Sequence, residues 1–154
     1  MIRVSDRQHI FDLLSGLKPV TPPLFGKMTP QHMIEHLILS MTFCNGKAPQ
    51  VLMVPERLSR TIKHHTVNTI EEMGKGFKAP MLSDDPPPLI YEDLTTAISQ
   101  LKKETEDFDA FFKKAPHAKP VSPVLGELDH KEWIIFHNKH FTHHFRQFGL
   151  IGNE

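Results

Sequence analysis

Histidine is the residue type with the clearest capacity for chemistry in this sequence. The chain has 154 residues, of which 11 are histidines, and four of these lie between residues 137 and 144. In a helix, His140 and His144 are about 40° apart around the axis and about 6 Å apart along it. Two imidazoles at this spacing can bind one metal ion, whereas His137 lies about 10.5 Å from His144 along the axis. The pair His140 and His144 therefore predicts part of a metal site, and a facing helix must supply the third ligand.

The third ligand is predicted to be His36. Residues 30–44 contain both His32 and His36, and the apolar residues of this segment form a stripe that would face the protein interior. On a helical wheel, His36 lies about 40° closer to that stripe than His32 does. Three neutral imidazoles bind Zn²⁺, Ni²⁺, Co²⁺ or Fe²⁺ and leave positions open for water or substrate, which is typical of catalytic rather than structural sites.

The same pattern has alternative explanations, which stay open at this point. Surface histidines often fall four residues apart, so one His-x-x-x-His pair is weak evidence of a metal site. Here, however, Trp133 sets an inward face on which positions 137, 140 and 144 also lie. Buried imidazoles need a hydrogen-bond partner, water or a metal. The cluster is therefore either a metal site or a hydrogen-bonded polar core, and His137 as a fourth ligand would make the metal site a closed one.

Other residues near these positions have several candidate roles. His143 lies about 60° from His140 around the helix axis, where it could contact a substrate or simply pack at the surface. His143, Glu104 and Glu35 are candidates for a general base, and the sequence does not select among them. Cys44 lies on the inward face of its segment and is predicted to be a small buried hydrophobe rather than a nucleophile. The remaining histidines are predicted to be solvated or in loops, namely His9, His64, His65, His117 and His130.

Helices separated by prolines and glycines must position these residues. Apolar periodicity, N-cap residues and proline clusters predict main helices over residues 7–17, 30–44, 89–115 and 130–148. Residues 47–88 are less regular and are interpreted as an insertion with one helical piece over 55–65, interrupted by Gly74, Gly76, Pro80 and Pro86–Pro88. The sequence therefore predicts one all-α domain over residues 1–154, a four-helix bundle with a long crossover.

Composition excludes several classes of function. Lys and Arg number 18, as do Asp and Glu, and the sequence pI is about 7.2, so no net positive charge favours a nucleic-acid partner. A single cysteine excludes an internal disulfide framework, and no apolar run is long enough for a membrane span or signal segment. These features predict a cytoplasmic protein with no nucleic-acid or membrane partner.

Two segments carry a family resemblance. The first is KMTPQHMIEH at residues 27–36; the second begins with GELDHKEW at 126–133 and ends with HFTHHFRQFG at 140–149. With these motifs and its helical order, the chain resembles the DinB/YfiT-like superfamily and, within it, a domain family of unknown function. The resemblance implies a four-helix bundle in which His36, His140 and His144 hold a metal, and it also implies a homodimer. The segment 47–88 departs from the shared pattern and could shape or block the pocket.

The resemblance leads to two classes of function. Superfamily members include metal-dependent transferases and isomerases that use low-molecular-weight thiols, such as bacillithiol or mycothiol, and hydrolases. The first hypothesis is therefore a metal-dependent thiol S-transferase or hydrolase that acts on a small molecule, because a metal can lower the pKa of a bound thiol or water. The alternative is a non-catalytic bundle that binds a metal or small ligand. A metal-free bundle with hydrogen-bonded histidines is a third hypothesis.

Overall fold

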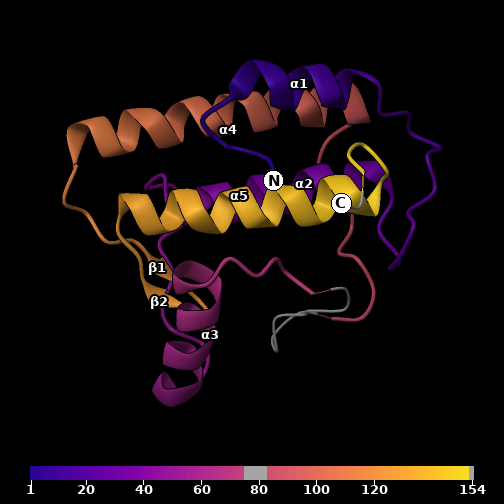
Figure 1. Cartoon of the computed structure of the whole chain (residues 1–154). Coiled ribbons are helices and arrows are strands. Elements are labelled where there is room, and N and C mark those ends of the chain that lie inside the picture. Colours follow the sequence, from indigo (N-terminus) through magenta and orange to yellow (C-terminus); the bar gives the residue numbers. More distant parts are fainter. Residues whose placement is uncertain (75–82, 153–154) are drawn as a thin grey trace.

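The computed structural model describes residues 1–74 and 83–152 and is mostly helical (Figure 1). The two described strands form only a short antiparallel hairpin, in which Val121 lies opposite Glu127. The prediction of a mainly helical fold is therefore confirmed. The hairpin was not predicted, because two-residue strands are too short to show alternation. The described elements are α1 (Arg7–Ser15), α2 (Pro30–Thr42), α3 (Glu56–Asn68), α4 (Leu94–Lys114), β1 (Val121–Ser122), β2 (Gly126–Glu127) and α5 (His130–Gln147).

Helices α2 and α5, which carry the clustered histidines, begin where their capping residues predict. The Thr29 side chain accepts a hydrogen bond from the backbone N–H of His32, and Pro30 occupies the first helical position. At the start of α5, Asp129 and Glu132 form the predicted capping box. Because both starting points are fixed by local sequence, the positions of the histidines along each helix are fixed as well.

The other helix boundaries differ from the prediction by a few residues. Helix α1 ends at Ser15 rather than at residue 17, and α3 continues to Asn68 rather than ending at residue 65. Helix α4 begins at Leu94, not at residue 89, because the Asp93 side chain caps it by accepting a hydrogen bond from the N–H of Thr96. Of the predicted insertion at 47–88, residues 75–82, including Gly76 and Pro80, lie outside the described residues.

The helices are arranged in two groups. Helices α1 and α4 lie together above α2 and α5 in Figure 1, while α3 projects downward beside the hairpin. Helix α4 packs on α2, and α3 packs on α5 and β2. No helix among the described residues combines the length and apolar character needed to cross a membrane. The histidine-bearing helices α2 and α5 therefore meet beneath α4, and α3 lies against the other side of α5.

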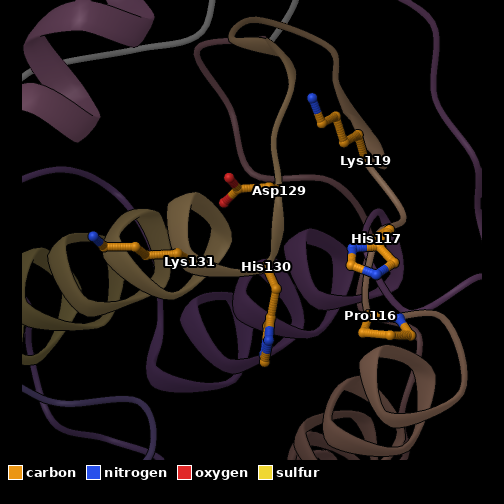
Figure 2. A pocket seen from close by; sticks show the side chains of 6 residues that line it. All are labelled: Pro116, His117, Lys119, Asp129, His130 and Lys131. Atoms are coloured by element: carbon orange, nitrogen blue, oxygen red, sulfur yellow. The ribbon is translucent and has the colours of Figure 1, made fainter.

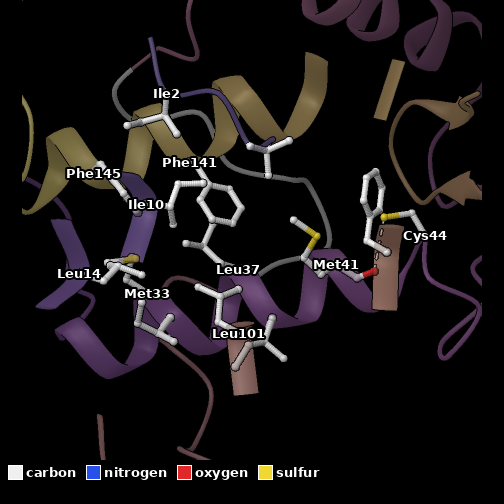
Figure 3. Packing of buried hydrophobic residues seen from close by; sticks show 14 of the residues in the cluster. Ile2, Ile10, Leu14, Met33, Leu37, Met41, Cys44, Leu101, Phe141 and Phe145 are labelled. Carbon is white, nitrogen blue, oxygen red and sulfur yellow. Dashed lines mark hydrogen bonds between the residues drawn. The ribbon is translucent and has the colours of Figure 1, made fainter. Parts of the chain in front are cut away.

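The core lies between these helices (Figure 3). Trp133 is 1% exposed, so the predicted inward face of α5 is buried. Cys44, two residues after the end of α2, is fully buried, as predicted for a small hydrophobe. Helices α1, α2, α4 and α5 all contribute to the cluster drawn in Figure 3, with Ile10, Leu14, Met33, Leu37, Met41, Leu101, Phe141 and Phe145 among its members.

Two segments from the N-terminal part of the chain hold α5 in place. The backbone N–H groups of Ile2 and Val4 donate to the Thr142 hydroxyl (2.8 Å) and to the Asn138 side-chain oxygen (2.6 Å). Further along the chain, the N–H of Leu24 donates to the backbone carbonyl of Gln147 at 2.7 Å. The C-terminal half of α5, where the histidines are concentrated, is thus secured by residues more than a hundred positions away.

Candidate metal centre

The structure brings together the three histidines that the sequence predicts as ligands. His36 on α2 faces His140 and His144, which lie one turn apart on α5. One ligand atom from each ring lies within 4.8 Å of the other two. Among the residues that the structure describes, these three form the group of histidine, cysteine and acidic side chains with the geometry to hold a metal ion.

The distances within this cluster are close to those that a shared ion requires. The Nε2 atoms of His36 and His140 are 2.9 Å apart, and the three pairs of ring centroids are separated by 4.8 to 4.9 Å. Nitrogens that each lie about 2.1 Å from a common tetrahedral ion are roughly 3.4 Å from one another. Small rotations of the imidazole rings therefore suffice to bring all three nitrogens to one ion.

Burial prepares these imidazoles to bind a cation. His140 and His144 are 6% and 5% exposed, and His36 is half-buried. Burial lowers the pKa of His36 to about 4, with a further contribution from His143, and it holds the pKa values of His140 and His144 well below 6.5. All three rings are neutral at pH 7, so their lone pairs are available without the loss of a proton.

Hydrogen bonds to neighbouring residues orient the two rings of α5. The Nδ1 of His140 lies 3.3 Å from the Ser40 hydroxyl, which itself donates to the Leu37 carbonyl at 2.9 Å. The Nδ1 of His144 lies 2.7 Å from the side-chain oxygen of Gln147. Sequence reasoning did not select Ser40 or Gln147, although Ser40 lies on the inward stripe of α2 and Gln147 follows His144 by three positions, a spacing that allows contact on a helix.

His143 lies at the edge of the cluster. Its Nδ1 is 3.3 Å from the Met73 carbonyl, and its ring packs edge-on against Phe25 and His144, with centroid distances of 5.3 and 4.9 Å. The side chain is half-buried, and burial lowers its pKa. Of the three candidates for a general base, His143 is the one beside the three-histidine cluster.

The two glutamates considered as general bases bind other groups. Glu35 accepts hydrogen bonds from the backbone N–H groups of Ile90 and Tyr91 at 2.8 and 3.0 Å, which ties the segment before α4 to α2. Glu104 is 3% exposed. Its carboxylate accepts hydrogen bonds from the side chains of Asn45, Lys47 and Gln100. These contacts give both carboxylates a structural role.

His137 is buried on the predicted inward face but belongs to a separate pair. Its Nε2 lies 3.2 Å from the Cys44 sulfur, and its ring stacks on Trp133 at 5.4 Å. Burial lowers the pKa of His137 to about 3 and raises that of the Cys44 thiol. Both groups are therefore neutral, and the buried thiol is not an activated nucleophile. The Nδ1 of His137 has no hydrogen-bond partner among the described residues.

The other histidines mostly follow the prediction of exposure, with one correction. His9, His64, His65 and His117 are exposed, although His64 and His65 lie in α3 rather than in a loop. The expectation for His130 was wrong, because its ring is half-buried and stacks on Phe112 at 4.3 Å. Its aromatic neighbours come from α4, so no periodicity around residue 130 could reveal them. His32 caps α2, with its Nδ1 2.8 Å from the Thr29 hydroxyl.

Two pockets lie among the described residues outside the cluster. The larger has a volume of about 390 Å³ and lies where α4 ends and α5 begins (Figure 2). Its lining includes Lys119, Lys131 and Asp129, and none of the three clustered histidines. The smaller, about 180 Å³, is lined in part by Met73 and Phe136. Met73 contacts His143, and the Phe136 ring lies 5.1 Å from that of His140. Met73 and Phe136 therefore lie between the smaller pocket and the cluster, although none of the clustered histidines lines that pocket.

Comparisons with protein-family models, with curated proteins and with solved structures found no match. Function must therefore be inferred from the side chains around the cluster. These supply three neutral imidazoles from two helices, ring nitrogens that are held by neighbouring residues, and a fourth histidine at the edge. This donor set suits a borderline divalent cation such as Zn²⁺, Ni²⁺, Co²⁺ or Fe²⁺.

Proposed function

We propose that His36, His140 and His144 bind one divalent metal ion, and that the protein is a metal-dependent enzyme of the thiol S-transferase or hydrolase type acting on a small molecule. The observation that carries this proposal is the convergence of three neutral ring nitrogens within 4.8 Å. Buried imidazoles are costly unless they have partners, so their collection at one point favours a shared cation.

We also propose that the chain is a divergent member of the DinB/YfiT-like superfamily. In this proposal α1, α2, α4 and α5 are the four helices of the bundle, and α3 belongs to the crossover between α2 and α4. Its support is the order of the helices and the origin of the histidines, one from α2 and two from α5. The superfamily also suggests a homodimer and a low-molecular-weight thiol as co-substrate.

The bound ion and the residues around it would have different roles in catalysis. A divalent ion with three imidazole ligands acts as a Lewis acid and lowers the pKa of a water or thiol that it binds. The Met73 carbonyl can only accept a hydrogen bond, so the Nδ1 of His143 donates to it and Nε2 keeps a lone pair. His143 is thus placed to accept a hydrogen bond from a bound molecule. Phe136 and Met73, which contact His140 and His143, would offer apolar surface beside that molecule.

The strongest rival is a histidine core that binds no metal. The 2.9 Å distance between the Nε2 atoms of His36 and His140 also fits a direct hydrogen bond, in which one ring donates its proton to the other. A closed metal-binding module is less well supported, because His137, the fourth ligand that this alternative would use, contacts Cys44 instead. Metal content therefore separates the two main alternatives.

The decisive experiment is elemental analysis of protein purified without an affinity tag, because a tag supplies its own histidines. The wild type is compared with His36→Ala, with His140→Ala/His144→Ala, and with a matched control, His9→Ala, at an exposed position on α1. We expect about one equivalent of metal in the wild type and the control, and loss in both cluster variants.

Thermal unfolding supplies a second readout. Metal at a hundred times its Kd stabilises a protein by about 2.7 kcal/mol, which corresponds to a rise in Tm of roughly 5–11 °C for a chain of this size. The rise should be absent in His36→Ala and reversed by a chelator. A wild type that carries no metal, binds none on titration and ignores the chelator would establish the hydrogen-bonded core and refute the proposal.

A further inference from the structure

Gln147 links His144 to a distant part of the chain. Its side chain is buried, with 4% of the residue exposed. The side-chain nitrogen donates to the carbonyl of Phe25 at 2.9 Å, and the side-chain oxygen lies 2.7 Å from the Nδ1 of His144. Phe25 precedes Gln147 by 122 positions in the sequence, so this contact exists only in the folded protein.

The contacts of Gln147 determine where the proton of His144 resides. A backbone carbonyl only accepts hydrogen bonds, so the group that faces Phe25 must be the amide NH₂ of Gln147. The amide oxygen therefore faces His144, and since this oxygen also only accepts, Nδ1 of His144 must carry the hydrogen. A neutral imidazole has one N–H, which leaves Nε2 with a lone pair.

The segment 24–26 prevents the amide of Gln147 from turning over. The N–H of Leu24 donates to the backbone carbonyl of Gln147 at 2.7 Å, so main chain and side chain are held by the same segment. Gly26 has φ of +77°, and a Cβ at this position would lie 2.9 Å from the Gln147 side-chain nitrogen. Only glycine permits this close approach without a shift, and a flipped amide would place its oxygen against the Phe25 carbonyl.

We propose that Gln147 is a positioning residue that, anchored by the carbonyl of Phe25, holds His144 in its Nδ1–H form and so presents Nε2 of His144 as a metal ligand. This inference rests on the proposed metal site. Hydrogen bonds from neighbouring groups to the far nitrogen of a ligating histidine fix its tautomer and raise its basicity, and their loss typically costs 10–100-fold in metal affinity.

The first test is the tautomer itself. In metal-free, ¹⁵N-labelled protein, long-range ¹H–¹⁵N correlation spectra distinguish a protonated from an unprotonated imidazole nitrogen. We expect the wild type to show His144 with hydrogen on Nδ1, and Gln147→Leu to show a mixture or the Nε2–H form. His144 protonated at Nε2 in the wild type would overturn the inference, whether or not the protein binds metal.

The second test is metal affinity, measured by competition of Zn²⁺ or Co²⁺ with a chromophoric chelator. Gln147→Leu and the more nearly isosteric Gln147→Met both remove the acceptor for Nδ1 and the donor to the Phe25 carbonyl, and both should bind 10–100-fold more weakly. Gln100→Leu is the matched control, because Gln100 is half-buried and its side chain donates a hydrogen bond to Glu104, also on α4. The metal affinity of this variant should not change.

The outcomes separate this inference from the metal proposal. Equal affinities of Gln147→Leu and the wild type would refute a positioning role for Gln147. If Gln147→Leu fails to fold, Gln147→Met and the wild-type spectrum still decide: the Nδ1–H form in the wild type together with its loss in Gln147→Met supports the inference, and retention of that form in Gln147→Met refutes it. A wild type that binds no metal but shows the Nδ1–H form would refute the metal site alone.

Discussion

The buried ring of His137 should make the stability of the protein depend on pH in a way that can be measured separately from the metal cluster. His137 is fully buried among aromatic rings, and burial lowers its pKa to about 3. In the unfolded chain its pKa returns to about 6.5. Between these two values the unfolded state binds a proton that the folded state excludes, so stability is lost as the pH falls through this range.

The size of the effect follows from the two pKa values. At pH 7.5 the unfolded ring is almost entirely neutral, and the contribution of His137 to the free energy of unfolding is close to zero. At pH 5 protonation of the unfolded ring stabilises the unfolded state by about 2 kcal/mol, because the slope approaches about 1.4 kcal/mol per pH unit below pH 6.5. Replacement of His137 by a residue that does not titrate should remove this pH-dependent decrease in the free energy of unfolding.

The assay is urea unfolding of the wild type and His137→Gln at pH 7.5 and pH 5, with chelator present so that metal binding does not contribute. Between the two pH values the wild type should lose about 2 kcal/mol more than the variant, or roughly 1 M in urea midpoint. The other histidines are present in both proteins, and their contributions cancel to a first approximation.

The matched control His9→Gln makes the same substitution at an exposed position on α1, where we expect it to leave the pH dependence of the wild type unchanged. If the stability difference between wild type and His137→Gln stays constant within about 0.5 kcal/mol across this pH range, the ring is not buried and neutral as the structure indicates. In that case the reasoning from desolvation fails for this site.

Two further predictions concern buried polar contacts. Glu104→Gln should lower the free energy of unfolding by about 2 kcal/mol, because one amide NH₂ must then face the donor of Asn45 or Gln100; an unchanged urea midpoint would show that this network contributes nothing. Gly26→Ala should cost about 1–3 kcal/mol, since its φ of +77° strains a residue with a Cβ and that Cβ would press on the Gln147 amide. A Tm equal to that of the wild type would contradict it.

Much of the helical framework could be predicted from local sequence. Thr29 with Pro30, and Asp129 with Glu132, mark the starts of α2 and α5 because capping involves residues only three positions apart. The start of α4 was predicted five residues too early, because the helix was extended back to Leu89 although its periodic apolar residues begin at Leu94, directly after the cap at Asp93. The β1–β2 hairpin gave no signal, since its strands have two residues each.

The candidate site also has features that local sequence predicts and features that it does not. The spacing of His140 and His144 on α5 is a property of one helix, and the inward stripe of α2 is enough to favour His36 over His32. The contact partner of His137 is harder to predict from the sequence. Its register on α5 predicts burial, but whether it joins the cluster depends on what the end of α2 places opposite it, which is Cys44.

The sequence by itself determined the main helices and the register of the histidines on them, because helix periodicity and capping act over three or four residues. The tertiary structure alone decided which side chains meet across elements. It sets the 2.9 Å approach of His36 to His140 and the contact between Gln147 and Phe25, which lie 104 and 122 positions apart in the chain. Such contacts depend on how the apolar faces of distant helices interlock, and no local periodicity encodes that packing.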